Sequence, residues 1–183
     1  MRNTIRKGVL AVAAMMLLAA APLAACGDAE TAIRDDLTGR LEAVKQGDES
    51  FVSSIEEDAG EDLDSLGVDA GEFAAAFLDG FDYTVGDVTF EDGMATVEAT
   101  IESKSLDGIM TGFQNDYYAR LETLSLAELS DRDTLTRLAG ETMMETVENA
   151  DIVGTDCEFT YTRTPKGRWK CDDGDETLAQ AME

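Results

Sequence analysis

The sequence predicts an α+β fold in which an antiparallel sheet, built from two hairpins, packs against amphipathic helices. Apolar and polar residues alternate over residues 81–90 and 95–101, which is the period of a half-buried strand. Before and after this region, apolar residues recur every three or four positions, as in amphipathic helices. Helices and hairpins in this order are typical of a sheet with helices on one face.

The first helical region starts at Thr31 and stops at Gly47, where the glycine interrupts the periodic pattern. Its apolar stripe consists of Ile33, Leu37, Leu41 and Val44. The acidic stretch of residues 56–67 contains glycines, and we expect a loop or a frayed helix there. Asp69 with Glu72 forms a capping box, which predicts the start of another helix.

The first hairpin is the best-defined element of the sequence. Asp92-Gly93 is a strong two-residue turn signal, and it fixes the cross-strand register. The predicted pairs are Val88 with Val97, Thr89 with Thr96, and Phe90 with Ala95. The apolar alternation shifts by one residue at Gly86-Asp87, which predicts a β-bulge that restores the apolar face.

Two further helices are predicted between the hairpins. One begins after Ser105, and the other follows a capping box formed by Ser130 and Asp133. The first of these helices carries Tyr117 and Tyr118, which cannot both face the core because they are adjacent. These two tyrosines are therefore the first candidates for ligand contacts, whereas the other aromatic residues are expected to fill the core or to line a cavity.

The second hairpin is expected from residue 157 to residue 171, around a turn that contains Pro165 and Gly167. One register forms three cross-strand pairs: Cys157 with Cys171, Glu158 with Lys170, and Phe159 with Trp169. A tight turn centred on Pro165 would instead separate the two cysteines by roughly 13 Å, too far for a disulfide. Because the first register makes three favourable pairs, we expect it, together with the Cys157–Cys171 disulfide.

The N-terminus has the layout of a secretory signal peptide, with three basic residues before an uncharged apolar run over residues 8–21. The run is shorter than the roughly 20 residues of a membrane-spanning helix. It leads through small residues into Cys26, which resembles the lipobox of bacterial lipoproteins. The resemblance implies cleavage of residues 1–25 and lipidation of Cys26. Because the helical pattern begins at Thr31, residues 26–30 are expected to be the lipidated cysteine and a short tether, and residues 31–183 one α+β domain of ordinary length.

Such a protein would be held on the outer face of the cytoplasmic membrane, or in the periplasm or outer membrane of a Gram-negative source. Lipidation would use one of the three cysteines, and an oxidising compartment independently favours a disulfide between the remaining two.

The net charge excludes one class of partner. Removing residues 1–25 takes away Arg2, Arg6 and Lys7 and no carboxylate, so the charge of −25 becomes −28. This charge argues against nucleic acid and against anionic lipid surfaces as partners, because both would repel it. The expected partners are the membrane, through the lipid on Cys26, and an unknown small molecule, peptide or envelope protein.

Three segments resemble small bacterial lipoproteins with an NTF2-like, cystatin-like fold. They are Leu41–Asp48, Phe81–Phe90 and Ala95–Ile101. The resemblance covers residues 32–171 in the order of the elements, and it implies no defined activity. The chain departs from such domains in its long helical insert between the hairpins. It also lacks the His and Asp pairs that enzymatic members often carry, since it has no histidine.

The residue types do not favour catalysis. Histidine is absent, the serines lack a base, and there is no glycine-rich phosphate loop. The acidic runs at residues 56–64 and 172–176 lack the ligand spacing of a calcium loop. We therefore expect no catalytic residue, no metal and no cofactor. A binding or interaction module is favoured over a structural or sensory accessory, with a carboxylate-based enzyme third.

The lipidation prediction can be tested with Cys26→Ser. Because the thiol is the acceptor of the lipid, this variant should stay unprocessed or be released into the medium. The measurement is the apparent mass and the membrane fraction of the protein in cell extracts. A variant that is still cleaved after Ala25 and still bound to the membrane would contradict the prediction.

Overall fold

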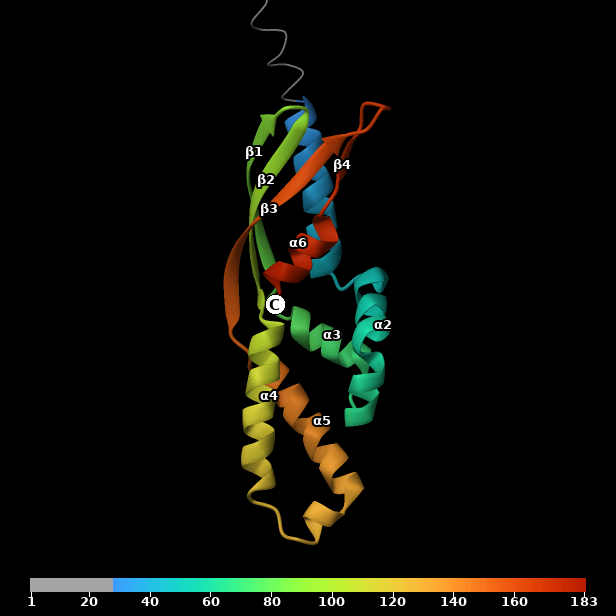
Figure 1. Cartoon of the computed structure of the whole chain (residues 1–183), viewed down its shortest axis with the longest axis vertical. Helices are drawn as coiled ribbons and strands as arrows, with labels where there is room; N and C mark the ends of the chain where they lie inside the picture. Colours follow the sequence, from blue (N-terminus) through green and yellow to red (C-terminus); the bar gives the residue numbers. More distant parts are fainter. Residues whose placement is uncertain (1–27) are drawn as a thin grey trace, which may run out of the picture.

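The structure is a computed structural model that describes residues 28–183, and the molecule is elongated (Figure 1). The N-terminal helix covers residues 28–45. It is followed by α2 (Glu49–Leu66), α3 (Ala70–Leu78), β1 (Asp82–Glu91), β2 (Met94–Lys104), α4 (Leu106–Leu121), a short 3₁₀ helix (Glu128–Ser130), α5 (Arg132–Glu148), β3 (Ile152–Arg163), β4 (Trp169–Cys171) and α6 (Gly174–Ala181).

The four strands form one antiparallel sheet in the order β1-β2-β3-β4. The two hairpins lie side by side, and the long pairing of β2 with β3 joins them. The N-terminal helix and α6 lie beside the sheet, whereas α4 and α5 form the opposite end of the molecule (Figure 1). The predicted α+β class, an antiparallel sheet of two hairpins packed against helices, is confirmed.

The first hairpin forms as predicted. Val88 pairs with Val97, Thr89 with Thr96, and Phe90 with Ala95. The register shifts between Val85 and Val88, so the predicted bulge at Gly86-Asp87 is confirmed. Asp92 and Gly93 both have positive φ, at 49° and 80°, which is the backbone of a two-residue hairpin turn that follows the twist of the strands.

The core lies between the inner face of the sheet and the helices. The N-terminal helix contributes Ile33, Leu37 and Leu41, which are at most 1% exposed. The sheet contributes alternate residues of β2 and β3 to the same cluster, including Val97, Ile101, Phe159 and Tyr161. Because one face of each strand is buried in this way, the opposite face of the sheet is left to the polar residues.

Helix boundaries differ from the predictions at three places. The N-terminal helix already includes residues 28–30, which were expected to belong to the tether. The acidic stretch after residue 56 is part of the continuous helix α2, because Leu63 is buried and holds the segment against the core. The N-cap of α5 is Asp131 rather than Ser130, whereas the predicted cap Asp69 and the predicted start of a helix after Ser105 are confirmed.

The predicted register of the second hairpin is wrong. Cys171 pairs with Tyr161, not with Cys157, and the ladder continues to Arg163 and Trp169 around a tight turn. This register buries the tyrosine ring completely. It also lets the backbone N–H of Thr160 donate to the carboxylate of the residue that precedes α6. These contacts replace the salt pair and aromatic pair on which the predicted register was based.

Gly140 of α5 lies directly against the end of α2. A Cβ atom at this position would be 2.5 Å from the backbone oxygen of Leu66, far inside the contact distance. A backbone oxygen cannot swing away as a flexible side chain can. The close approach of α5 to α2 therefore depends on the absence of a side chain at residue 140.

Replacing this glycine should destabilise the fold. Gly140→Ala must push the two helices apart, so the free energy of unfolding should fall by about 1 to 2 kcal/mol even after the gain in helix propensity. The matched control is Gly39→Ala, at a helical position where a Cβ atom meets nothing within 4 Å. The control should raise stability by about 0.5 to 1 kcal/mol. Urea melts of both variants measure the difference, and equal shifts would contradict the packing described.

Candidate functional site

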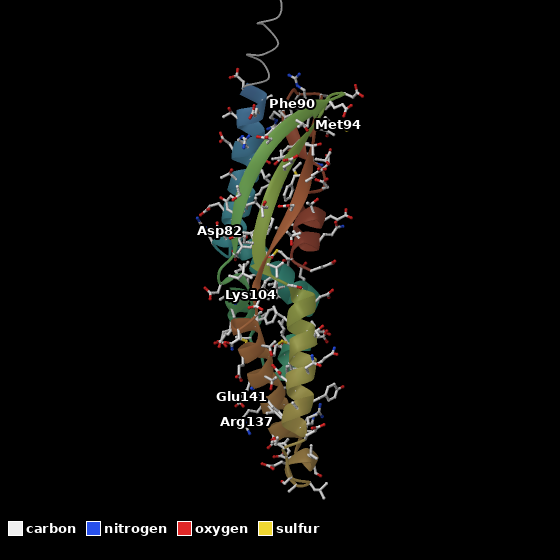
Figure 2. All side chains as sticks on the ribbon, turned by 90° about the vertical axis from the view of Figure 1, so that its left-hand side faces the viewer. Asp82, Phe90, Met94, Lys104, Arg137 and Glu141 are labelled. Carbon is white, nitrogen blue, oxygen red and sulfur yellow. The ribbon has the colours of Figure 1, made fainter. Side chains whose placement is uncertain are left out.

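One face of the sheet is not covered by helices, and this face carries polar side chains (Figure 2). Glu98 and Thr100 of β2 point to this face, since their neighbours Ala99 and Ile101 are buried on the other. Asp156 and Glu158 of β3 lie opposite them. The alternation of apolar and polar residues over 95–101 predicts this arrangement, with Glu98 and Thr100 on the solvent side of the strand.

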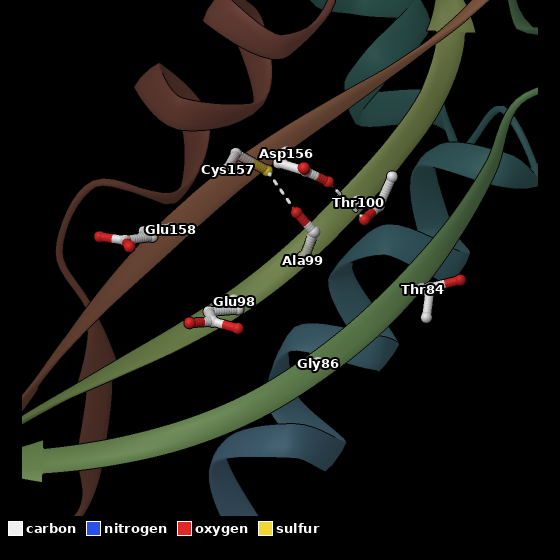
Figure 3. Close-up of a pocket in the computed structure, with 8 residues that line it drawn as sticks. All are labelled: Thr84, Gly86, Glu98, Ala99, Thr100, Asp156, Cys157 and Glu158. Carbon is white, nitrogen blue, oxygen red and sulfur yellow. Dashed lines mark hydrogen bonds between the residues drawn. The ribbon is translucent and has the colours of Figure 1, made fainter.

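The centre of this face is a hollow of about 690 Å³ (Figure 3). It is lined by Thr84, Gly86, Glu98, Ala99, Thr100, Asp156, Cys157 and Glu158. The bulge forms one wall, because a Cβ atom at Gly86 would lie only 3.0 Å from the backbone oxygen of Glu98. Glycine at the bulge thus allows β1 to approach β2 closely beside the hollow.

The hollow gathers negative charge. Glu98 of β2 is the direct cross-strand partner of Glu158, and no ion pair within residues 28–183 involves either carboxylate. Like charges directly opposite each other destabilise a sheet. Asp156 adds a third carboxylate and accepts a hydrogen bond from the hydroxyl of Thr100 at 2.7 Å. This arrangement would attract a cation placed over the sheet.

These carboxylates are spread along the strands rather than gathered around one point. Among residues 28–183, no group of three or more His, Cys, Asp or Glu side chains could hold a metal ion. The geometry therefore suits a partner with distributed positive charge better than it suits a single metal ion.

The N-terminal helix holds the β-bulge of β1 in place. The guanidinium of Arg34 donates hydrogen bonds to the backbone oxygens of Val85 and Gly86. Its charge is also paired with Glu30 at 3.2 Å, one turn earlier in the N-terminal helix. The two bulge carbonyls thus have a charged donor, which holds the irregular part of β1 in one conformation.

Part of β3 is a free sheet edge. Strand β4 pairs only with residues 161–163, so within the described chain no strand continues along β3 beyond them on that side. Thr160 directs its N–H and C=O groups to this side, where they bond Asp173 and Asp172. Alternate residues of a strand direct these groups to the same edge. The residues that share this direction farther along the strand are Gly154, Asp156 and Glu158, all of them exposed.

A second polar cluster lies on the inner face, between the N-terminal helix and β3. The hydroxyl of the fully buried Tyr161 donates to Asp36 at 3.0 Å, and Asp36 also accepts from the guanidinium of Arg40 at 2.8 Å. Burial is the main cause that raises the pKa of Tyr161 well above its ordinary value, and the neighbouring Cys171 thiol and Asp36 add to it. The Tyr161 hydroxyl therefore stays protonated near neutral pH. It can hold the N-terminal helix in position through Asp36, but it cannot act as a base.

The two cysteines do not form the predicted disulfide. Both Cys157 and Cys171 are free thiols. Cys171 is paired with Tyr161, four residues along β3 from Cys157, so the cysteines are offset by roughly 13 Å along the strand. This distance exceeds the reach of a disulfide. Burial raises the pKa of both thiols, with smaller contributions from Asp156 at Cys157 and from Asp173 at Cys171.

The predicted ligand residues Tyr117 and Tyr118 lie on α4, away from the hollow. Tyr118 is 65% exposed, whereas Tyr117 is half-buried and stacks on Phe113 with ring centroids 5.6 Å apart. Neither tyrosine lines the sheet-face hollow. Their role in ligand binding stays a prediction, and Cys26 lies outside the described residues.

The acidic hollow cannot be identified from the sequence, because its two sides come from β2 and β3, which α4 and α5 separate along the chain. The alternation of Asp156 and Glu158 on β3 is visible in the sequence, as is the alternation around Glu98 on β2. The missing information was the pairing of β2 with β3, which no turn motif specifies.

The free thiols lead to a testable expectation. In the folded protein both cysteines should react slowly with iodoacetamide at pH 8, because burial keeps them protonated and the thiolate is the nucleophile. In denaturant both should react quickly. Mass spectrometry of nonreduced peptides should find Cys157 and Cys171 unlinked in protein isolated without a reductant. A linked peptide pair would restore the other hairpin register and contradict the structure.

Comparisons with known proteins add little. No family model and no curated protein matches the chain. Among solved structures, the chain is similar to a proposed lipoprotein, YcdA of Bacillus subtilis, with 14% sequence identity and a TM-score of 0.43. The match covers 73% of this chain and 46% of YcdA, so this chain spans about half the length of that protein. At this TM-score the likeness carries no conclusion, and the NTF2-like resemblance stays a prediction. No helix of residues 28–183 has the length and apolar character needed to cross a membrane.

Proposed function

We propose that this protein is a lipid-anchored, non-catalytic binding module of the cell envelope. We further propose that it binds an extended, positively charged segment of an envelope partner. The binding surface consists of the acidic hollow around Glu98, Asp156 and Glu158, together with the free edge of β3. The observation that carries the proposal is that Glu98 lies directly opposite Glu158 with no cation between them in the described chain, next to the part of β3 that pairs with no strand on its outer side.

Lipid anchoring is supported by the basic N-terminus, the apolar run and the small residues before Cys26. The N-terminal helix is already formed at residue 28, so only Gly27 separates the proposed lipidated cysteine from the described helix. An anchored domain with so short a connection would stay close to the membrane surface.

Binding of an extended segment is supported by the backbone of β3. Although α6 packs against β3, the N–H and C=O groups of Gly154, Asp156 and Glu158 make no hydrogen bond to β4 within residues 28–183, so a partner strand could bond them in the manner of β-strand addition. The charges of a lysine- or arginine-rich segment would offset the repulsion between the carboxylates. Edge pairing would supply affinity, and the charge pattern would supply selectivity.

A non-catalytic role is supported by the chemistry of the titratable groups. The chain has no histidine, and burial raises the pKa of both free thiols and of Tyr161. These shifts keep each group in its neutral form near neutral pH, so none of them is poised as a nucleophile or as a general base.

A peptide of alternating lysine and valine tests the proposal. Amide NMR of the mature chain should show shifts at Gly154, Asp156 and Glu158 during the titration. Replacing the three carboxylates, as Glu98→Gln with Asp156→Asn and Glu158→Gln, should weaken binding about tenfold, since each exposed ion pair contributes roughly 0.2 to 1 kcal/mol.

The matched control removes three carboxylates elsewhere, with Glu56→Gln, Glu57→Gln and Glu61→Gln on α2. It changes the net charge by the same amount but leaves the sheet face intact, so it should retain most of the affinity. The absence of shifts along β3, or an equal loss of affinity in the two triple variants, would refute the proposed binding surface.

A further inference from the structure

One end of the elongated molecule carries a group of basic residues, although the chain as a whole is strongly acidic. The start of the N-terminal helix, the β1–β2 turn and the β3–β4 turn all lie at this end, and the α4–α5 connection lies at the other (Figure 1). We call the first the anchor end, since residue 28 follows Cys26 by two residues. Two residues span at most about 7 Å, so a lipid on Cys26 would hold this end at the membrane.

Positive charge is concentrated at the anchor end. Of the 14 lysines and arginines, Arg2, Arg6 and Lys7 lie in the leader, and four of the remaining 11 fall within residues 163–170. They are Arg163, Lys166, Arg168 and Lys170. Lys170 is paired with Asp172 at 3.5 Å. The other three are exposed and take part in no ion pair within residues 28–183.

The β3–β4 turn holds these cations in a defined arrangement. The N–H of Thr164 donates to the backbone oxygen of Arg168 at 2.7 Å, and the N–H of Arg168 donates to the Thr164 hydroxyl at 3.1 Å. Gly167 has a φ of 79°, which lets the chain reverse within a short loop. The turn is therefore a closed, hydrogen-bonded projection rather than a loose loop.

Apolar and aromatic side chains accompany these charges. Phe90 and Met94 are 38% and 47% exposed, and both lie near the anchor end (Figure 2). The Phe90 ring meets Trp169 edge-on at 5.7 Å, although β2 and β3 lie between their strands. The sheet therefore curls enough for the half-buried Trp169 of β4 to reach the exposed Phe90 of β1, and the two rings lie together near the anchor end.

We propose that the anchor end contacts the membrane, with Arg163, Lys166 and Arg168 on the phosphates of anionic phospholipids and Trp169 at the headgroup level. The proposal rests on the lipid anchoring proposed above. Tryptophan prefers the membrane–water interface, and long basic side chains reach its phosphates. Basic residues near an anionic surface strengthen binding about fivefold each.

The net charge of −28 does not oppose this contact. At physiological ionic strength, charges farther than about 8 to 10 Å from a phosphate are largely screened. The carboxylates of helices α2, α3, α4 and α5 lie farther along the molecule from this end (Figure 1), so they oppose the contact only weakly. At the anchor end itself, Asp28, Glu91 and Asp92 carry negative charge against the contact, so the three cations of the β3–β4 turn are needed to make it favourable.

Trp169 is the only tryptophan in the chain, so its fluorescence reports on this surface alone. The acylated protein, with its lipid confirmed by mass spectrometry, is reconstituted into vesicles that contain brominated phosphatidylcholine. With phosphatidylglycerol also present, Trp169 should be quenched. Quenching should fall sharply in the Arg163→Gln, Lys166→Gln, Arg168→Gln variant.

The matched control carries Arg120→Gln, Arg132→Gln and Arg137→Gln in the α4–α5 end, which is the same change in charge. Its quenching should equal that of the parent protein. A second arm uses the unacylated Cys26→Ser chain and flotation with the same vesicles. Removing the three turn cations should reduce this binding on the order of 100-fold, from about fivefold per cation.

The two arms separate this proposal from lipid anchoring. Absence of the acyl mass would refute the anchor, and the flotation arm would still test the turn. Unquenched Trp169 in the acylated protein, or equal quenching in both triple variants, would overturn the membrane contact. A spectral change with soluble polyphosphate but no quenching by brominated lipid would also overturn it, and would assign the turn to a soluble polyanion.

Discussion

The structure depends on the N-terminal helix lying across the inner face of the sheet. Its residues Ile33, Leu37 and Leu41 are almost completely buried, and Tyr161 of β3 reaches back to Asp36 of the same helix. Without this layer the apolar inner face of β2 and β3 would be open to water. The helix also holds the β-bulge through Arg34, so the shape of the outer hollow depends on a contact made from the inside.

The two hairpins show which parts of a sheet can be predicted from local sequence. The β1–β2 register was predicted correctly because a two-residue Asp92-Gly93 turn permits one geometry. The β3–β4 loop permits two registers, and the correct choice depends on partners outside the hairpin. Tyr161 bonds Asp36, 125 residues earlier in the chain, and such long-range contacts leave no periodic signal. The disulfide prediction failed for the same reason.

The candidate site, like the sheet, could be predicted only in part from local sequence. Local alternation was enough to place Glu98 on the solvent face, but its partner Glu158 belongs to a strand that follows two intervening helices. The sequence thus predicted that the surface is acidic, but not where on the fold the carboxylates come together. The basic β3–β4 turn could not be predicted from the net charge either, because a net charge says nothing about where individual charges lie in the fold. In the fold, three exposed cations that form no ion pair within residues 28–183 lie together in and beside the β3–β4 turn, and three carboxylates lie together on the outer face of the sheet.

The hydrogen bond between Tyr161 and Asp36 has a mechanical consequence. The N-terminal helix runs beside the strands, and its first described residue follows almost directly on Cys26 (Figure 1). A pull transmitted from residue 28 along the helix axis would load the buried side chains and this hydrogen bond together, in shear. Contacts that share a load in parallel resist more force than contacts that peel apart one at a time. The same helix that completes the core would thus also serve as the strain-bearing link between an anchor and the sheet.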